Sequence, residues 1–194
     1  MMIPYVKNQA KFKDIEYYLF DENPYIDEPY GPNWKDMQEL FFKAANIPDE
    51  RIHIMTSNDW QDYDNKIRNA GGIDVMVIGL GYDGHFCGNC PRCTPFDSYT
   101  YCIDFKKKQA VNPDYGDRPR QPRTLTMGPK SLMRVKHLVM IVNGKEKAEI
   151  FKRFLDEPIN QDVPATILKL HPNFTVICDQ AAASLIDPQQ YSNL

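Results

Sequence analysis

The sequence contains no apolar run close to the roughly 20 residues that a membrane-spanning helix needs. Its first residues, MMIPYVKNQAKFKDIEYY, also lack the apolar centre of a signal peptide. There is no internal repeat and no low-complexity tract. The fifteen prolines are scattered through expected turns, so no segment reads as a linker. These absences predict a cytoplasmic protein that has no membrane partner and folds as a single domain over residues 1–194.

An excess of positive charge is also lacking. The formal net charge is -3 and the pI is near 5.8, with the basic residues interspersed among Asp and Glu. Such a surface has no general attraction for nucleic acid, so we expect no nucleic acid as a partner. The five cysteines are an odd number, and without an export signal they do not predict a disulfide framework. We therefore expect free thiols.

What the chain does contain is an alternation of strand and helix patterns. Apolar residues at helical spacing after Asn33 predict a helix that this residue caps. Residues 73–80 are almost entirely apolar, which predicts a central parallel strand buried on both faces. Further strands are predicted at residues 15–20, 52–55, 124–127, 137–142 and 174–178, with helices at 59–68, after Pro129 and along 148–155, and an irregular stretch at 91–122. The alternation predicts an α/β fold with a mostly parallel sheet flanked by helices.

Polar groups follow three of the predicted strands, where ligands gather in open α/β sheets. Asp21 and Glu22 follow the first, and a carboxylate there can act as a base or merely begin a turn. Asp83 and His85 follow the apolar strand, where the carboxylate can hold the imidazole in one tautomer for proton exchange; a common Asp-Gly turn is the alternative. Lys147 opens a predicted helix, where an anion such as phosphate fits, with a surface lysine as the alternative.

Cys87, Cys90 and Cys93 form a C-x-x-C-x-x-C run close to His85 and Cys102. This spacing resembles zinc or iron–sulfur ligation. The compact run has no fourth cysteine, however, and the Gly, Asn and Pro residues between the cysteines also suit a substrate loop. We therefore expect no metal here and keep a metal site as the alternative.

The segment from Gly79 to Pro91, GLGYDGHFCGNCP, resembles the G-x-G-x-D-G-H-x-x-x-N-E-P signature of glucosamine-6-phosphate deaminases. Four more segments resemble the family in order, namely Asp21-Glu22, TLTMG from Thr124, GKEKA from Gly144 and PATILKLHP from Pro164. The Asp-Gly-His triplet alone also occurs in the related 6-phosphogluconolactonases. The ordered set and the Asn89-x-Pro91 ending favour the deaminase side.

The resemblance implies a modified Rossmann-like domain that converts an amino-sugar phosphate from aldose to ketose with loss of ammonia, without metal or organic cofactor. It makes Asp21 the base that moves a proton between C2 and C1 through an enol intermediate. His85 would open the sugar ring with support from Asp83, and Cys90 stands in the position of the family glutamate that completes this relay. Substrate binding would fall to Glu22, Gly81, Gly84, Asn89 and Lys147, the last as a point charge for the phosphate.

The resemblance also places the first residue near the end of the family's second helix. We therefore expect an N-terminally shortened sheet that has an exposed edge and lacks the family's Gly-Ser/Asn-Thr-Pro phosphate loop. Two other functions stay open: a non-catalytic sugar-phosphate-binding paralogue, and a lactone hydrolase in which His85 activates water. The expected partner is a small phosphorylated sugar, and a homo-oligomer is one of the open oligomeric states.

Overall fold

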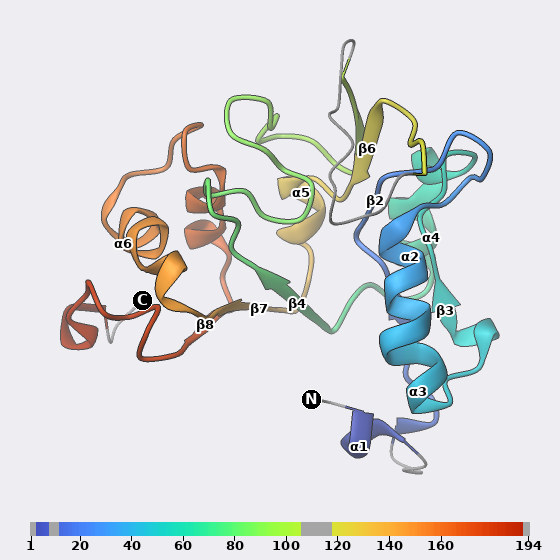
Figure 1. Cartoon of the computed structure of the whole chain (residues 1–194), viewed down its shortest axis with the longest axis horizontal. Coiled ribbons are helices and arrows are strands. Elements are labelled where there is room, and N and C mark those ends of the chain that lie inside the picture. The colour runs from blue at the N-terminus through green and yellow to red at the C-terminus, as the bar shows by residue number, and fades with distance from the viewer. Residues whose placement is uncertain (1–2, 8–11, 106–117, 192–194) are drawn as a thin grey trace. The chain divides into compact units, whose positions relative to one another are not determined.

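The computed structural model describes residues 3–7, 12–105 and 118–191 (Figure 1). Contacts within the chain divide it into two compact units, Met1–Trp60 with Cys102–Thr126 and Gln61–Tyr101 with Met127–Leu194. They are called the first and the second unit below. The prediction of a single domain over residues 1–194 stays a prediction. Within the described ranges, every helix is too short or too polar to cross a membrane.

The first unit is built from short strands. Strand β1 (Tyr17–Tyr18) runs parallel to β3 (Ile52–His53), whereas β2 (Asp21–Glu22) pairs antiparallel with β6 (Arg123–Thr126). Strand β5 (Tyr101–Asp104) lies on the other side of β6, inside the stretch that we predicted to be irregular. Residues 106–117 of that stretch lie outside the described residues. The unit also contains two short helical segments, α1 (Ile3–Val6) and a 3-10 turn (Asp49–Arg51).

One continuous helical segment covers these strands. Helix α2 (Pro32–Met37) passes through a π-helical turn (Gln38–Phe42) into α3 (Lys43–Ala45). Its start differs from the prediction, because Gly31 and not Asn33 is the N-cap and Pro32 takes the first helical position. A proline fits there because its missing N–H would have no partner inside the helix. The apolar side of the segment packs into a core made by Leu19, Phe42, Ala45 and Ile47.

The second unit contains a parallel three-stranded sheet in the order β4-β7-β8. Its strands are β4 (Val75–Gly79), β7 (His137–Val142) and β8 (Phe174–Cys178), with Met76 opposite Leu138 and Met140 opposite Val176. The helices are α4 (Tyr63–Asn69), α5 (Pro129–Leu132) and α6 (Ala148–Asp156), with 3-10 segments at Trp60–Asp62, Lys145–Lys147, Pro164–Leu170 and Pro188–Tyr191. The predicted α/β fold with mostly parallel strand pairing is confirmed.

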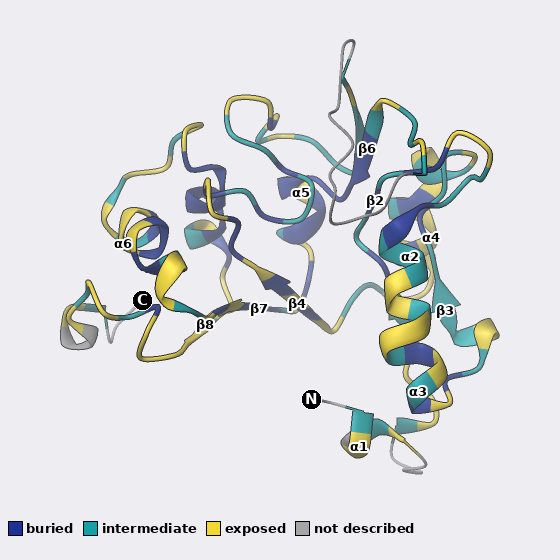
Figure 2. Cartoon of the chain, viewed as in Figure 1, coloured by how far each residue is buried: buried dark blue, intermediate teal, exposed yellow. Residues whose placement is uncertain are grey.

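Burial alternates along β4 (Figure 2). Met76 and Ile78 are buried, while Val75 and Val77 are 57% and 42% exposed. The prediction that this strand is buried on both faces is therefore wrong. The physical reason is that packing among the described residues covers only the face that carries Met76 and Ile78.

Candidate functional site

Asp21 lies on β2, opposite Thr126 of β6. Its carboxylate Oδ1 accepts a hydrogen bond of 2.8 Å from the side-chain amide of Asn33, which also approaches the Asp21 carbonyl oxygen at 3.3 Å. Burial, and after it the neighbouring charge of Glu22, raise the pKa of Asp21, while the Asn33 bond lowers it; the result is a pKa of about 7. A carboxylate with such a pKa changes its protonation close to neutral pH, as a general base must.

Glu22 points into the protein and is only 1% exposed. Its two oxygens accept the backbone N–H groups of Asn23, Asn33 and Trp34 at 2.8, 3.2 and 2.9 Å. Burial raises the pKa of Glu22 above its usual value, and these bonds reduce the rise without cancelling it. The carboxylate thus satisfies N–H groups of the first turn of α2, which have no acceptor inside the helix. Its predicted contact with substrate stays a prediction.

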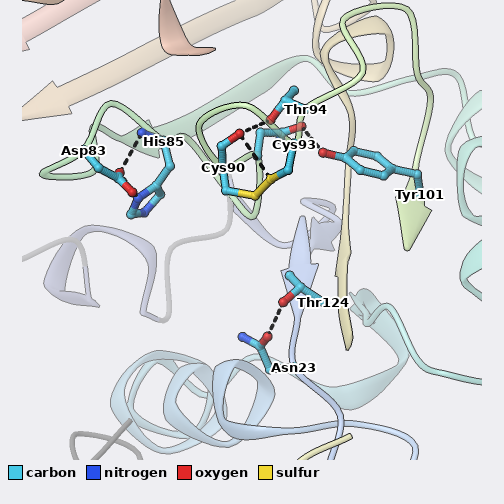
Figure 3. Close-up of a disulfide and its surroundings, with 9 residues drawn as sticks. Asn23, Asp83, His85, Cys90, Cys93, Thr94, Tyr101 and Thr124 are labelled. Carbon is cyan, nitrogen blue, oxygen red and sulfur yellow. Dashed lines mark hydrogen bonds and ion pairs between the residues drawn. A yellow bond between two sulfur atoms is a disulfide. The ribbon is translucent and has the colours of Figure 1, made fainter. Parts of the chain in front are cut away.

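The turn after β4 brings Asp83 and His85 together (Figure 3). Asp83 Oδ1 lies 2.6 Å from His85 Nδ1 and also accepts the backbone N–H of His85 at 3.1 Å. Burial alone raises the pKa of Asp83, but the bonds from the His85 backbone and ring bring that pKa below its usual value. An ionised Asp83 places the ring proton on Nδ1, which leaves Nε2 of His85 for proton exchange with a ligand.

Two glycines give this turn its shape. A Cβ atom on Gly81 would overlap the imidazole ring of His85, and Gly81 N donates to the His85 carbonyl oxygen at 2.7 Å. Gly84 has a φ of +89°, and its Cβ would lie 2.8 Å from Cγ1 of Val163. Both glycines are therefore needed for the backbone path that positions His85. Their predicted contact with substrate stays a prediction.

Lys147 reaches the same turn from the 3-10 segment that follows β7. Its Nζ donates to the carbonyl oxygen of Leu80 at 2.6 Å and lies 3.4 Å from the ring centroid of Tyr82. Burial brings the pKa of Lys147 below its usual value, although the charges of Glu146 and Asp83 oppose this shift. Lys147 is thus a half-buried cation held at the carboxyl end of β4, which suits the predicted binding of a phosphate.

Asn89 lies at the base of the loop that follows His85 and is fully buried. Its Nδ2 donates to the carbonyl oxygen of Met127 at 2.9 Å, and its Oδ1 accepts the hydroxyl of Tyr101 at 3.0 Å. Burial raises the pKa of Tyr101 to about 12, so this hydroxyl keeps its proton as a donor. Asn89 anchors the loop, and its predicted contact with substrate stays a prediction.

Cys90 and Cys93 form a disulfide in this loop (Figure 3). The expectation of free thiols is wrong for this pair, while Cys102 and Cys178 keep their thiols. The reason is local: Pro91 and Arg92 make a tight turn that brings the two Cα atoms to 5.6 Å, a usual distance for a disulfide. In this form Cys90 carries no thiol proton, so it cannot take the predicted place in the relay.

The structure brings Asp83, His85 and Lys147 together in the second unit, and Asp21 with Asn33 in the first. Sequence reasoning missed Asn33, whose role was assigned to capping, and Tyr82, which was not weighed as a partner of Lys147. In the described part of the chain, no three His, Cys, Asp or Glu side chains converge as a metal ion requires.

Comparison with known proteins identifies the family. Residues 4–177 match the model of the family described as glucosamine-6-phosphate isomerases/6-phosphogluconolactonase. The chain is 35% identical over 193 residues to the glucosamine-6-phosphate deaminase of Clostridium acetobutylicum, covering 94% of this chain and 79% of that protein. It is 36% identical over 196 residues to the glucosamine-6-phosphate deaminase of a Geobacillus species, covering 95% and 77%.

Solved structures agree with these relatives. A monomeric glucosamine-6-phosphate deaminase superimposes with a TM-score of 0.75 at 28% identity, covering 89% of this chain and 76% of that one. The 6-phosphogluconolactonase from Thermotoga maritima gives a TM-score of 0.68 at 20% identity over 91% and 79%, which supports the fold alone. The chain therefore belongs to the family of glucosamine-6-phosphate isomerases and 6-phosphogluconolactonases.

Proposed function

We propose that this protein acts on an amino-sugar phosphate of the glucosamine 6-phosphate type, converting the aldose into a ketose phosphate with release of ammonia. The deaminases to which the chain is similar carry this substrate in their names. The aldose-to-ketose step needs a base that moves one proton between neighbouring carbons. It also needs a group that exchanges a proton with the ring oxygen.

Asp21 is the proposed base. It removes the proton from C2 of the opened sugar, which gives an enol, and returns the proton to C1, which leaves an imine at C2. Water then adds to C2, the C2–N bond breaks, and the ketose and ammonia are released. A pKa of about 7 suits both directions, because the group accepts and releases the proton at neutral pH. Asn33 orients the carboxylate, and Glu22 supports it from the next position by fixing the start of α2.

His85 is the proposed ring-opening group. Its Nε2 exchanges a proton with the ring oxygen, while Asp83 holds the ring orientation through Nδ1. This Asp83–His85 hydrogen bond of 2.6 Å is the observation that best supports the proposal. Lys147 binds the phosphate, and Gly81, Gly84 and Asn89 shape the loop around the sugar. In the reduced protein, the Cys90 thiol takes the position of the family glutamate.

Deuterium exchange tests the proposal. The protein, kept in reductant, is incubated with glucosamine 6-phosphate in D2O, and label at C1 and C2 is followed by NMR. We expect the wild type to incorporate label and Asp21→Asn to lose at least a hundredfold in rate. Asp49→Asn, an exposed aspartate on another turn of the same unit, is the matched control and keeps the wild-type rate. Undiminished exchange in Asp21→Asn removes this residue from the role of base.

The same samples separate the two other functions. A sugar-phosphate-binding paralogue gives thermal stabilisation by the ligand with neither label nor ammonia. A lactone hydrolase releases acid from a sugar-phosphate lactone and leaves glucosamine 6-phosphate unlabelled. The cytoplasmic location and the oligomeric state expected from the sequence stay predictions.

A further inference from the structure

The Cys90–Cys93 disulfide closes a loop of four residues on the surface of the second unit. A cross-link over so short a segment restricts the unfolded chain less than one over a long segment, since the effect grows with the number of residues enclosed. Stabilisation of the fold is therefore not the main effect that we expect of the bond. Cys93 is exposed and Cys90 is partly exposed, so a small thiol or disulfide in solution reaches the pair. Exposed disulfides are the ones that exchange most readily.

The turn that carries the two cysteines is held by contacts that do not involve their sulfur atoms. Pro91 and Arg92 occupy its two central positions, and Arg92 has a φ of +59°, the arrangement expected of a type II turn. The backbone N–H of Cys93 donates to the Cys90 carbonyl oxygen at 3.4 Å, and the Thr94 hydroxyl donates to the same oxygen at 2.8 Å. These bonds keep the Cα atoms 5.6 Å apart.

Arg92 ties the turn to another segment of the same unit. Its backbone N–H donates to the carbonyl oxygen of Gln161 at 2.8 Å, and its Nε donates to Asp162 at 2.6 Å. The turn therefore stays in place when the disulfide is open. Two thiols held at bonding distance close far more readily than two separate thiols, because each is always near the other.

We propose that Cys90 and Cys93 are a reversible thiol–disulfide pair that reacts with low-molecular-weight disulfides, and that closing it switches off the proton relay at His85. In the first step the Cys93 thiolate attacks one sulfur of the small disulfide, forms a mixed disulfide and releases one thiolate. The Cys90 thiolate then attacks the Cys93 sulfur and releases the second. The protein loses two protons and two electrons, and the small disulfide becomes two thiols.

The switching half of this inference rests on the proposed function. The dithiol form offers the Cys90 thiol at the position of the family glutamate, five residues after His85 and next to the buried anchor Asn89. The disulfide form offers no exchangeable proton there. Closure therefore lowers turnover without dismantling the loop, whose anchors at Asn89 and Arg92 do not depend on the bond.

The test uses the full chain equilibrated with mixtures of reduced and oxidised glutathione. Acid-quenched samples are alkylated and each cysteine is quantified by peptide mass spectrometry. We expect Cys90 and Cys93 to lose alkylation together as the mixture becomes oxidising, and to recover together in dithiothreitol. Alkylation of both residues at every ratio, or a bond that resists reduction in the folded protein, overturns the inference.

Two variants sharpen the test. Cys93→Ser cannot close the bond, so Cys90 is found as a thiol or a glutathione adduct, and turnover in reductant equals that of the wild type. Cys178→Ser, an exposed cysteine at the end of β8, leaves the coupled loss at Cys90 and Cys93 unchanged. A disulfide between Cys90 and another cysteine of the chain in Cys93→Ser would mean that the pair has been assigned wrongly.

Turnover of glucosamine 6-phosphate is measured on the same samples. We expect at least a tenfold lower rate in the closed form, in proportion to the fraction of bonded Cys90. Equal rates in both forms overturn the switching half and leave the reversible pair standing. Absence of turnover in both forms counts against the proposed function, while the alkylation result still decides whether the pair is reversible.

Discussion

The side-chain amide of Asn33 donates a 2.8 Å hydrogen bond to the carboxylate of Asp21, although the two residues are twelve positions apart in sequence. The bond ties the start of α2 to the first residue of β2. It also opposes the burial that raises the pKa of Asp21 to about 7. The proposed base is therefore kept within reach of neutral pH by a residue that itself carries no charge.

Replacing Asn33 by alanine tests this arrangement. The loss of a donor to the carboxylate moves the pKa of Asp21 upward, so the rate of substrate proton exchange rises with pH at a higher midpoint than in the wild type. A hydrogen bond to a charged group contributes about 1.5–3 kcal/mol, so we expect roughly a tenfold slower exchange at pH 7. Asn58→Ala, an exposed asparagine of the same unit, keeps the wild-type profile. An unshifted profile in Asn33→Ala shows that the bond does not tune the base.

The raised pKa of Asp21 also predicts how stability depends on pH. A carboxyl whose pKa is higher in the folded state than its unfolded value of about 3.9 favours folding while it is protonated. This contribution is fully present below about pH 4 and is lost as the pH rises towards 7. Asp21→Asn has no carboxyl group to titrate at this position. The difference in the free energy of unfolding, variant minus wild type, should therefore rise by about 3 kcal/mol between pH 4 and pH 8. Urea unfolding at several pH values measures it, and a constant difference refutes the prediction.

Gly81→Ala tests the geometry of the turn. The added Cβ overlaps the ring of His85, so the ring moves and its bond to Asp83 is lost. Because general acid–base catalysis contributes about 10²–10⁴ in rate, we expect turnover to fall by roughly a hundredfold. Gly79→Ala is the matched control, since its nearest neighbour would lie 4.0 Å from the new Cβ and normal turnover is expected. If both variants lose activity equally, the loss does not come from the His85 ring.

Lys147→Met tests the phosphate contact. Removal of the cation leaves the phosphate without its point charge, so the KM for a phosphorylated sugar should rise roughly ten- to a hundredfold with a smaller change in kcat. Lys145→Met, in the same 3-10 segment but exposed, is the control and keeps the wild-type KM. Steady-state kinetics measure both variants. An unchanged KM in Lys147→Met assigns the phosphate to other residues.

The sequence predicted the second unit well where strands are apolar and continuous. The predicted bounds of β7 and β8 equal the observed ones. For β7 the reason is that a nearly uninterrupted apolar run at the centre of the described parallel sheet leaves little choice of ends. In the first unit, β1 keeps only two residues of a longer predicted strand. The helix start was also misplaced, since the deciding contact is the distant carboxylate of Glu22 and not a local cap.

In the candidate site, too, contacts between sequence neighbours could be predicted, whereas contacts that depend on the tertiary fold could not. Asp83 and His85 lie two positions apart in a turn, so their contact follows from local sequence. The partnership of Asp21 with Asn33 depends on the fold of the intervening turn, which no periodicity encodes. The disulfide was missed because cysteine number and spacing do not reveal that Arg92 adopts a positive φ and closes the turn.

The most direct test of the proposed function is to count products. Reduced protein is mixed with glucosamine 6-phosphate, and ammonia and ketose phosphate are measured over time in the same sample. We expect equal amounts of both from the wild type, with His85→Gln and Asp21→Asn at least a hundredfold slower. Ammonia no higher than in Asp21→Asn, in a sample where the sugar phosphate still raises the melting temperature, would contradict it.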